Sequence, residues 1–349
     1  MYNPDVDIIV PVWNRPVETR ASLVNLSSHS PGARLILINN GSDRETESLL
    51  EEFADLLDDR ALLISTPVNL GFVKAVNKGL ARSEAEFALV VRSSTLVSEG
   101  WLDPLLTLAR ARPEAGIVAP RLSSGNRTRK GDENPFAGTE IDCGDFSAML
   151  IRRKMYSRIG GFDEEMDSGI WCLKDYSRRA LKAGYLTCSS PESRVSLVDE
   201  TVYGSVSRRE EIREKSRALY ARRWGTGQGF CIQILRDATP GSIREQFTLL
   251  ERGARQGHHF TVFAFPKTFR EITRNGFDLL HSNIRLEKLP RFFAASRAEG
   301  VIRTLGDAGE PPTLVGREGE GITMEDLKRL IDGTARGYYG DYTSDKAEG

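Results

Sequence analysis

The chain has few of the residues that hold metals or disulfide frameworks. Its 349 residues include only four histidines and four cysteines. The cysteines lie far apart, and no two of them form a C-x-x-C pair. This pattern indicates neither a zinc site nor a fold held together by disulfides. A reducing compartment suits such a chain, and we expect it to be cytoplasmic.

Long apolar runs and an excess of charge of one sign are also missing. No run of about eighteen apolar residues occurs, and the first residues show no basic segment followed by an apolar one. We therefore expect at most peripheral contact with the inner membrane face. The formal net charge of -1 creates no general attraction for nucleic acid. The apolar share of 40% and the charged share of 28% are typical of a globular protein.

What the sequence does contain is an alternation of short apolar runs and amphipathic segments. Val6–Val12 (VDIIVPV) is a β-branched run that ends at Asn14-Arg15-Pro16, and it predicts a buried strand that enters a loop. Strands that alternate with helices predict an α/β domain with a mostly parallel sheet and ligands at the carboxyl ends of its strands. Further strands are expected at 34–39, 61–66, 86–91, 116–120 and 147–151, with helices at 19–27, 46–57, 72–82, 101–111 and 174–183.

A glycine-rich segment at 225–229 (GTGQG) is the best candidate for a linker between domains. A second α/β alternation begins after it. We therefore predict a first domain at 1–228 and a small α/β domain at 229–349, with a flexible tail at its end. The second part contains no P-loop and no G-x-G-x-x-G motif, so its role is not predicted.

Several motifs of the first domain occur in an order that resembles the family 2 glycosyltransferases, which have the GT-A fold. The motifs are the opening strand and turn at 9–15 (IVPVWNR), LINNGS at 37–42, NLGF at 69–72 with AVNKGL at 75–80, GGFDE at 160–164, and KDYSRRALKAGY at 174–185. The resemblance implies a nucleotide-sugar donor, and a UDP-sugar is the donor we expect. Thymidine and guanosine nucleotides remain open.

By position in these motifs, the resemblance places one set of residues around the donor: Pro11, Val12, Trp13, Asn14, Asn39, Asn69, Gly71, Lys74, Asn77, Arg92 and Ser94. Asn39 stands where the family has an aspartate that reads uracil, and an amide can accept and donate comparable hydrogen bonds. Asn39 is equally suited to a turn before Asn40-Gly41. Trp13 either stacks on the base or packs at the edge of the sheet.

The family ends its fourth strand with an Asp-x-Asp motif that binds Mg²⁺ or Mn²⁺, but this chain has Arg92-Ser93-Ser94 there. A neutral hydroxyl is a poor ligand for a hard cation. The family's later histidine is also missing, since no histidine lies at 198–205. We therefore expect no bound metal and doubt that activity depends on Mg²⁺ or Mn²⁺. Arg92 either takes over part of the cation's charge at the diphosphate or is a solvated residue in an inactive site.

The family's catalytic base is an aspartate at the opening of a helix, and the resemblance assigns that role to Asp175. Its neighbour Lys174 replaces an acidic residue of the family. The alternative is that Asp175 only pairs with Arg178 or Arg179. The sequence thus predicts an inverting transferase of the hexosyltransferase type, acting in polysaccharide biosynthesis on a glycan, lipid or other hydroxyl acceptor. The competing hypothesis is an inactive fold that binds nucleotide sugars or glycans or serves as a scaffold. A homo-oligomer is also open.

Overall fold

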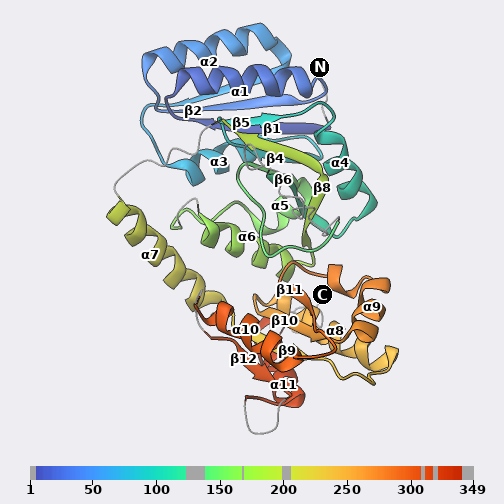
Figure 1. Cartoon of the computed structure of the whole chain (residues 1–349). Coiled ribbons are helices and arrows are strands. Elements are labelled where there is room, and N and C mark those ends of the chain that lie inside the picture. The colour runs from blue at the N-terminus through green and yellow to red at the C-terminus, as the bar shows by residue number, and fades with distance from the viewer. Residues whose placement is uncertain are drawn as a thin grey trace, which may run out of the picture. The chain divides into compact units, whose positions relative to one another are not determined.

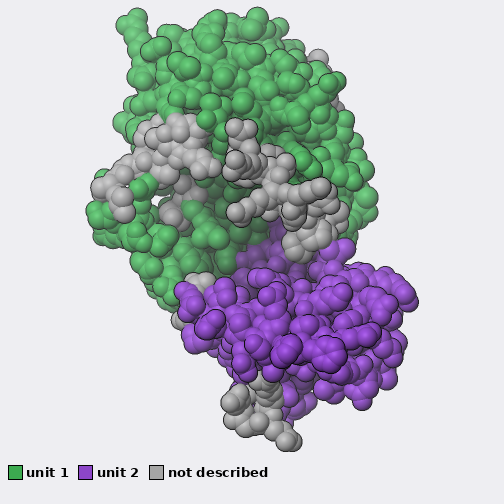
Figure 2. Space-filling model, viewed as in Figure 1, with its two compact units in different colours: residues 1–138, 143–224 green, residues 139–142, 225–349 purple. Residues whose placement is uncertain are grey.

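The computed structural model describes residues 5–122, 138–166, 169–198, 206–307, 311–316 and 321–339, with the side chains of 206 and 334–339 left out. The chain forms two compact units, shown in green and purple in Figure 2. Unit 1 comprises Met1–Gly138 and Cys143–Trp224, and unit 2 comprises Thr139–Asp142 and Gly225–Gly349. The end of the predicted tail lies outside the described residues.

Unit 1 is built on one large mixed sheet with the strand order β3-β2-β1-β4-β7-β6-β8-β5 (Figure 1). The strands are β1 (Val6–Val12), β2 (Arg34–Asn40), β3 (Ala61–Thr66), β4 (Phe87–Val91), β5 (Thr95–Val97), β6 (Ala115–Leu122), β7 (Ala148–Arg152) and β8 (Leu186–Leu197). The helices are α1 (Pro16–His29), α2 (Arg44–Leu57), α3 (Phe72–Leu80), α4 (Leu102–Ala111), α5 (Arg153–Ile159), α6 (Ile170–Lys182) and α7 (Val206–Trp224). A short 3₁₀ turn, η1 (Asp58–Arg60), precedes β3. The predicted α/β class is confirmed.

Helices cover both faces of this sheet because its central strands are apolar on both sides. All seven residues of β1 are buried. Ile8 and Val10 pack in one cluster with side chains of α1, α2 and α4, whereas Ile9 packs on the other face with α3, α5 and α6. Figure 1 shows α1 and α2 on one side of the sheet and α3 on the other. Continuous apolar runs are the signature of strands buried in this way.

A buried carboxylate fixes the amino end of the central strand. Asp7 on β1 accepts hydrogen bonds from Arg34 Nε at 2.8 Å, from Ser83 Oγ at 3.0 Å and from the backbone N–H of Ala85 at 3.0 Å. Burial raises the pKa of this carboxyl, but these donors outweigh burial and hold the pKa below its ordinary value. The Asp7 carboxylate at the amino end of β1 therefore has a structural role. The carboxyl end of the strands remains available for ligands.

The carboxyl ends of β1, β2, β3 and β4 lie at one edge of the sheet because these strands are parallel neighbours. Strand β7 runs antiparallel to β4, with Val91 opposite Ala148, so β7 begins at the same edge. Residues that follow the first four strands and residues that precede β7 therefore come together. We call this the donor edge.

Unit 2 contains a smaller, fully parallel sheet in the order β11-β10-β9-β12. Its elements are β9 (Gly229–Gln233), α8 (Pro240–Arg255), β10 (His259–Ala264), α9 (Pro266–Arg274), η2 (Phe277–Leu279), β11 (Ile284–Lys288), α10 (Ala294–Asp307), β12 (Thr313–Val315) and α11 (Met324–Tyr339). Side chains of α8, α9 and α11 pack on one face, and those of α10 pack on the other. The predicted second α/β alternation is confirmed. Within the part of the chain that the structure describes, no helix has the length and apolar character to span a bilayer.

Candidate functional site

The turn after β1 has an unusual backbone that brings Trp13 to the surface. Asn14 and Arg15 have φ values of 57° and 61°, in the left-handed region that residues other than glycine rarely enter. The Asn14 N–H donates to Ser42 Oγ at 3.1 Å, and Asn14 Oδ1 accepts from the Asp43 N–H at 2.8 Å. The loops after β1 and β2 are therefore tied together. Trp13 is 38% exposed at the donor edge.

Asn39, expected near the base, has its side chain buried in the turn after β2. It is 2% exposed, and its Oδ1 accepts a hydrogen bond from the Ser42 N–H at 3.0 Å. Its Nδ2 faces Glu47 Oε1 at 3.5 Å. This is the turn geometry that the sequence left open as the alternative. In this arrangement the amide oxygen is directed to the backbone of its own turn and the amide nitrogen to Glu47.

The neighbouring Asn40, which the sequence analysis did not single out, organises the loop that leads to α3. Its Nδ2 donates to Asn69 Oδ1 at 3.0 Å, and its Oδ1 accepts from the Leu70 N–H at 2.9 Å. Asn69 Oδ1 also accepts from the Gly71 N–H at 2.8 Å. Gly71 has a φ of 89° directly before α3, a conformation that favours glycine. Lys74 follows on the first turn of α3 and is exposed.

Asn77 uses both ends of its amide to join two of the family's characteristic motifs. Its Nδ2 donates to the Phe162 carbonyl at 2.9 Å and to Glu164 Oε1 at 3.0 Å, while its Oδ1 accepts from the Phe162 N–H at 2.8 Å. A Cβ on Gly161 would lie 2.4 Å from Asn77 Oδ1, so only glycine allows this approach. The expected nucleotide contact is thus, in this structure, a link between α3 and the loop at 160–164.

The end of β4 presents a cation to the donor edge. Arg92 is exposed, and its guanidinium lies 5.8 Å from the centroid of the Phe72 ring, within cation–π range. The carbonyl of Ser94 accepts a hydrogen bond from the Val198 N–H at 2.8 Å. A guanidinium and two hydroxyls do not fit a hard divalent cation. Among the described residues, no group of three or more His, Cys, Asp or Glu is placed to hold a metal ion.

Asp175, the expected base, is fully buried, at 0% exposure, on α6. Its carboxylate accepts hydrogen bonds from Arg179 Nε at 2.9 Å, Trp224 Nε1 at 2.8 Å and Arg223 Nη1 at 3.2 Å. The pairing with Arg179 is the alternative that the sequence left open. In this arrangement Asp175 joins α6 to the end of α7.

An exposed carboxylate that sequence reasoning missed lies on the segment before β7. Asp145 Oδ1 accepts a hydrogen bond from the Ser147 N–H at 2.6 Å, and Thr95 Oγ1 donates to the Ser147 carbonyl at 2.8 Å. Phe146, which lies between Asp145 and Ser147 in the sequence, packs edge-on against the Phe72 ring, with 5.0 Å between the ring centroids. This segment therefore lies beside Thr95, and Phe146 packs on the same Phe72 ring that the Arg92 guanidinium faces. Only the β4–β7 pairing reveals the proximity, because 52 positions separate Thr95 from Ser147.

Comparisons with known proteins agree with this architecture. The family model for glycosyl transferase family 2 matches residues 7–163. The pre-mycofactocin glycosyltransferase of Mycobacterium tuberculosis is 29% identical over 185 residues, which is 47% of this chain and 37% of that protein. The O-antigen biosynthesis protein RfbC of Myxococcus xanthus is 27% identical over 191 residues, covering 46% of this chain and 15% of that protein. The chain thus matches well under half the length of these relatives.

Two solved structures share the fold. The mannosyltransferase PcManGT from Pyrobaculum calidifontis, in complex with GDP-Man and Mn²⁺, superposes with a TM-score of 0.53 at 15% identity, covering 98% of this chain and 88% of that one. GalNAc-T7 with UDP, GalNAc and Mn²⁺ gives a TM-score of 0.52 at 13% identity, covering 63% and 48%. Residues 7–163 of the chain thus match the model of glycosyl transferase family 2, and the fold is the GT-A fold of these neighbours.

Proposed function

We propose that the chain is an inverting glycosyltransferase that moves a sugar from a nucleoside-diphosphate sugar to a hydroxyl of a glycan, lipid or other acceptor. The observation that carries the proposal is the donor edge, where Trp13, Lys74 and Arg92 reach the surface. An aromatic ring suits a nucleobase, and two cations suit a diphosphate. The hydrogen bonds of Asn14, Asn40 and Asn69 hold the loop that carries Trp13 and the segment that leads to Lys74.

The donor is expected to be a UDP-sugar, with GDP-sugars as the second class to be tested. The two structural neighbours were determined with GDP-Man and with UDP. Because the Asn39 amide is directed to its own turn, base discrimination would depend on backbone groups around Pro11–Asn14. We propose that Arg92 supplies charge at the diphosphate and that transfer needs no divalent metal.

Two carboxylates compete for the role of base. Family position indicates Asp175, but its three donors would have to move before it could reach an acceptor. Asp145 is exposed, and its neighbour Phe146 packs on the same Phe72 ring that the Arg92 guanidinium faces, which favours Asp145. In the proposed step Asp145 takes the proton of the acceptor hydroxyl, and the acceptor oxygen attacks the anomeric carbon. The diphosphate leaves with the electron pair of the broken carbon–oxygen bond, near Arg92.

Calorimetric titration with UDP- and GDP-sugars, with and without EDTA, tests the binding half of this proposal. We expect binding that persists in EDTA. For catalysis, Asp145→Asn and Asp175→Asn are compared in donor hydrolysis and transfer. A base contributes about 10²-fold or more, so Asp145→Asn should lower kcat by at least that factor while it leaves donor affinity intact.

Other outcomes would redirect the proposal. An unchanged kcat in Asp145→Asn together with a collapse in Asp175→Asn at unchanged stability would return the role to Asp175. Absence of nucleotide-sugar binding under every condition would instead support the scaffold hypothesis.

A further inference from the structure

Three large apolar side chains are exposed at one edge of unit 2. Leu235, which follows β9, is 67% exposed, and Phe292 and Phe293, which follow β11, are 77% and 87% exposed. Because β9, β10 and β11 are parallel neighbours, the segments after them share the carboxyl edge of the small sheet. Single exposed apolar residues are common, whereas a grouped set on one edge indicates an interaction surface.

The backbone at Phe293 keeps this ring in solvent. Phe293 has a φ of 58°, which is a strained conformation for a bulky residue. It stands immediately before α10, and its carbonyl accepts a hydrogen bond from the Arg297 N–H at 3.1 Å. Glycine or asparagine would enter this turn at a lower cost. Phe293 is both strained and almost fully exposed, and it follows another exposed phenylalanine. Insertion of both rings into an apolar environment outside the protein would explain this arrangement.

Cations surround these apolar residues. The segments at 234–239, 265–267 and 288–293 contain four exposed cations and one carboxylate, Asp237. The cations are Arg236, Lys267, Lys288 and Arg291. The Arg236 guanidinium lies 3.8 Å from the centroid of the Phe265 ring, which holds it at this edge. An apolar tip within a cationic rim is complementary to an anionic bilayer surface.

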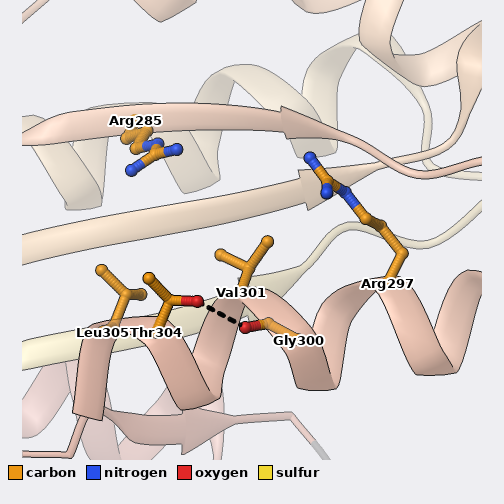
Figure 3. A pocket seen from close by; sticks show the side chains of 6 residues that line it. All are labelled: Arg285, Arg297, Gly300, Val301, Thr304 and Leu305. Carbon is orange, nitrogen blue, oxygen red and sulfur yellow. Dashed lines mark hydrogen bonds between the residues drawn. The ribbon is translucent and has the colours of Figure 1, made fainter. Parts of the chain in front are cut away.

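A small cavity that includes two further cations lies between β11 and α10. It has a volume of about 220 Å³, and Figure 3 shows the residues that line it, which are Arg285, Arg297, Gly300, Val301, Thr304 and Leu305. Arg285 pairs with Glu287 at 2.5 Å, and Arg297 lies 3.8 Å from the same carboxylate. One carboxylate thus balances two guanidinium groups, and a positive charge remains beside the apolar Val301 and Leu305. Such a lining suits the phosphate of a lipid head group.

We propose that this edge of unit 2 docks on an anionic lipid bilayer. Phe292 and Phe293 insert below the head groups, the rim cations contact lipid phosphates, and the cavity beside α10 accepts one head group. The inference goes beyond the proposed transferase function. It gives unit 2 the role of bringing the catalytic unit to a membrane surface.

Vesicle co-sedimentation of the full chain tests the proposal. We expect binding to vesicles of phosphatidylcholine mixed with phosphatidylglycerol, and weak binding to phosphatidylcholine alone. Phe292→Ser/Phe293→Ser should lower the affinity by about tenfold or more, because each ring would lose its apolar contact. The matched control is Leu56→Ser, which removes another exposed apolar side chain, on α2 of unit 1, and should not change binding.

A second variant tests the cations without touching the rings. Arg291→Gln/Arg297→Gln should weaken binding to the anionic vesicles several-fold and reduce its dependence on salt. Equal binding of the wild-type chain to both kinds of vesicle, or undiminished binding of the Phe292/Phe293 variant, would overturn the proposal. Light scattering that shows a concentration-dependent dimer lost in that variant would also overturn it, in favour of a second copy of the chain.

Discussion

At the scale of single residues, the family's motifs contain side chains whose polar atoms bond within the protein and exposed side chains that can contact a ligand. The first group forms hydrogen bonds within the protein, and it comprises Asn39, Asn40, Asn77 and Asp175. Buried polar groups need such partners, since an unmade hydrogen bond in the interior is costly. Chemistry with a substrate is therefore expected from the exposed Trp13, Lys74, Arg92 and Asp145.

Arg92 gives the most direct prediction at this scale. Arg92→Gln should weaken the binding of UDP by roughly 10- to 100-fold, because a charge-assisted hydrogen bond contributes about 1.5–3 kcal/mol. Uridine, which has no diphosphate, should bind both proteins equally. Calorimetry measures the two ligands, and Arg82→Gln, an exposed cation after α3, is the control. Equal losses for UDP and uridine would place Arg92 outside the diphosphate site.

At the scale of elements, side-chain amides connect loops that the strands alone would leave independent. The turn after β1 is bonded to the start of α2 through Asn14 and Asp43, and the end of β2 is bonded to the start of α3 through Asn40 and Asn69. Asn77 then bonds α3 to the loop before α6. Each of these hydrogen bonds restrains the position of a loop. A binding site can therefore form on segments that connect the strands and helices.

The link through Asn77 can be removed alone. Asn77→Ala should lower the free energy of unfolding by about 2–3 kcal/mol, because three hydrogen bonds are lost and the Phe162 backbone groups lose their partner. Hydrogen exchange should rise mainly at 160–166. Lys78→Ala, the exposed neighbour on α3, is the control. A uniform rise in exchange across unit 1 would show that the effect is not local.

At the scale of the whole molecule, the two units have separate hydrophobic cores, and unit 2 contains a buried histidine, His281. Thr139–Asp142 joins unit 2 through Glu140, whose carboxylate pairs with Arg255 at 2.7 Å and whose backbone bridges to His281. Burial lowers the pKa of His281 from 6.5 to about 4. The neutral imidazole accepts a hydrogen bond at Nδ1 from the Asn283 N–H at 3.0 Å.

This histidine makes the stability of unit 2 sensitive to mild acid. Between pH 6.5 and 4 the unfolded chain binds a proton at His281 that the folded unit does not, so stability is full above pH 6.5 and falls as the pH drops toward 4. The expected loss is about 3 kcal/mol at most. Hydrogen exchange of unit 2 peptides at several pH values measures it, and His281→Asn should flatten the dependence. A wild-type profile that is level over this range would contradict the assignment.

The sequence alone predicted strands β1 to β4, β6 and β7, the family resemblance and the presence of a second α/β unit, because continuous apolar runs and turn residues act locally. It missed the short strand β5. It did not predict β8, since LTCSSPESRVSL has little apolar pattern and is held by pairing with β6 and β5. The predicted change of domain at 228 lies close to Trp224–Gly225, but only long-range contacts assign Thr139–Asp142 to unit 2.

For the candidate site, the family resemblance predicted Trp13, Lys74 and Arg92 near the donor. In the structure Trp13 and Arg92 directly follow β1 and β4, and Lys74 lies on the first turn of α3. Tertiary structure decided the rest. It buried Asp175 under Arg179, Arg223 and Trp224 and turned Asn77 toward the loop at 160–164. It also brought the segment that carries Asp145 against Thr95 and Phe72. Burial and hydrogen-bond partners depend on segments far apart in the chain, and no local pattern contains that information.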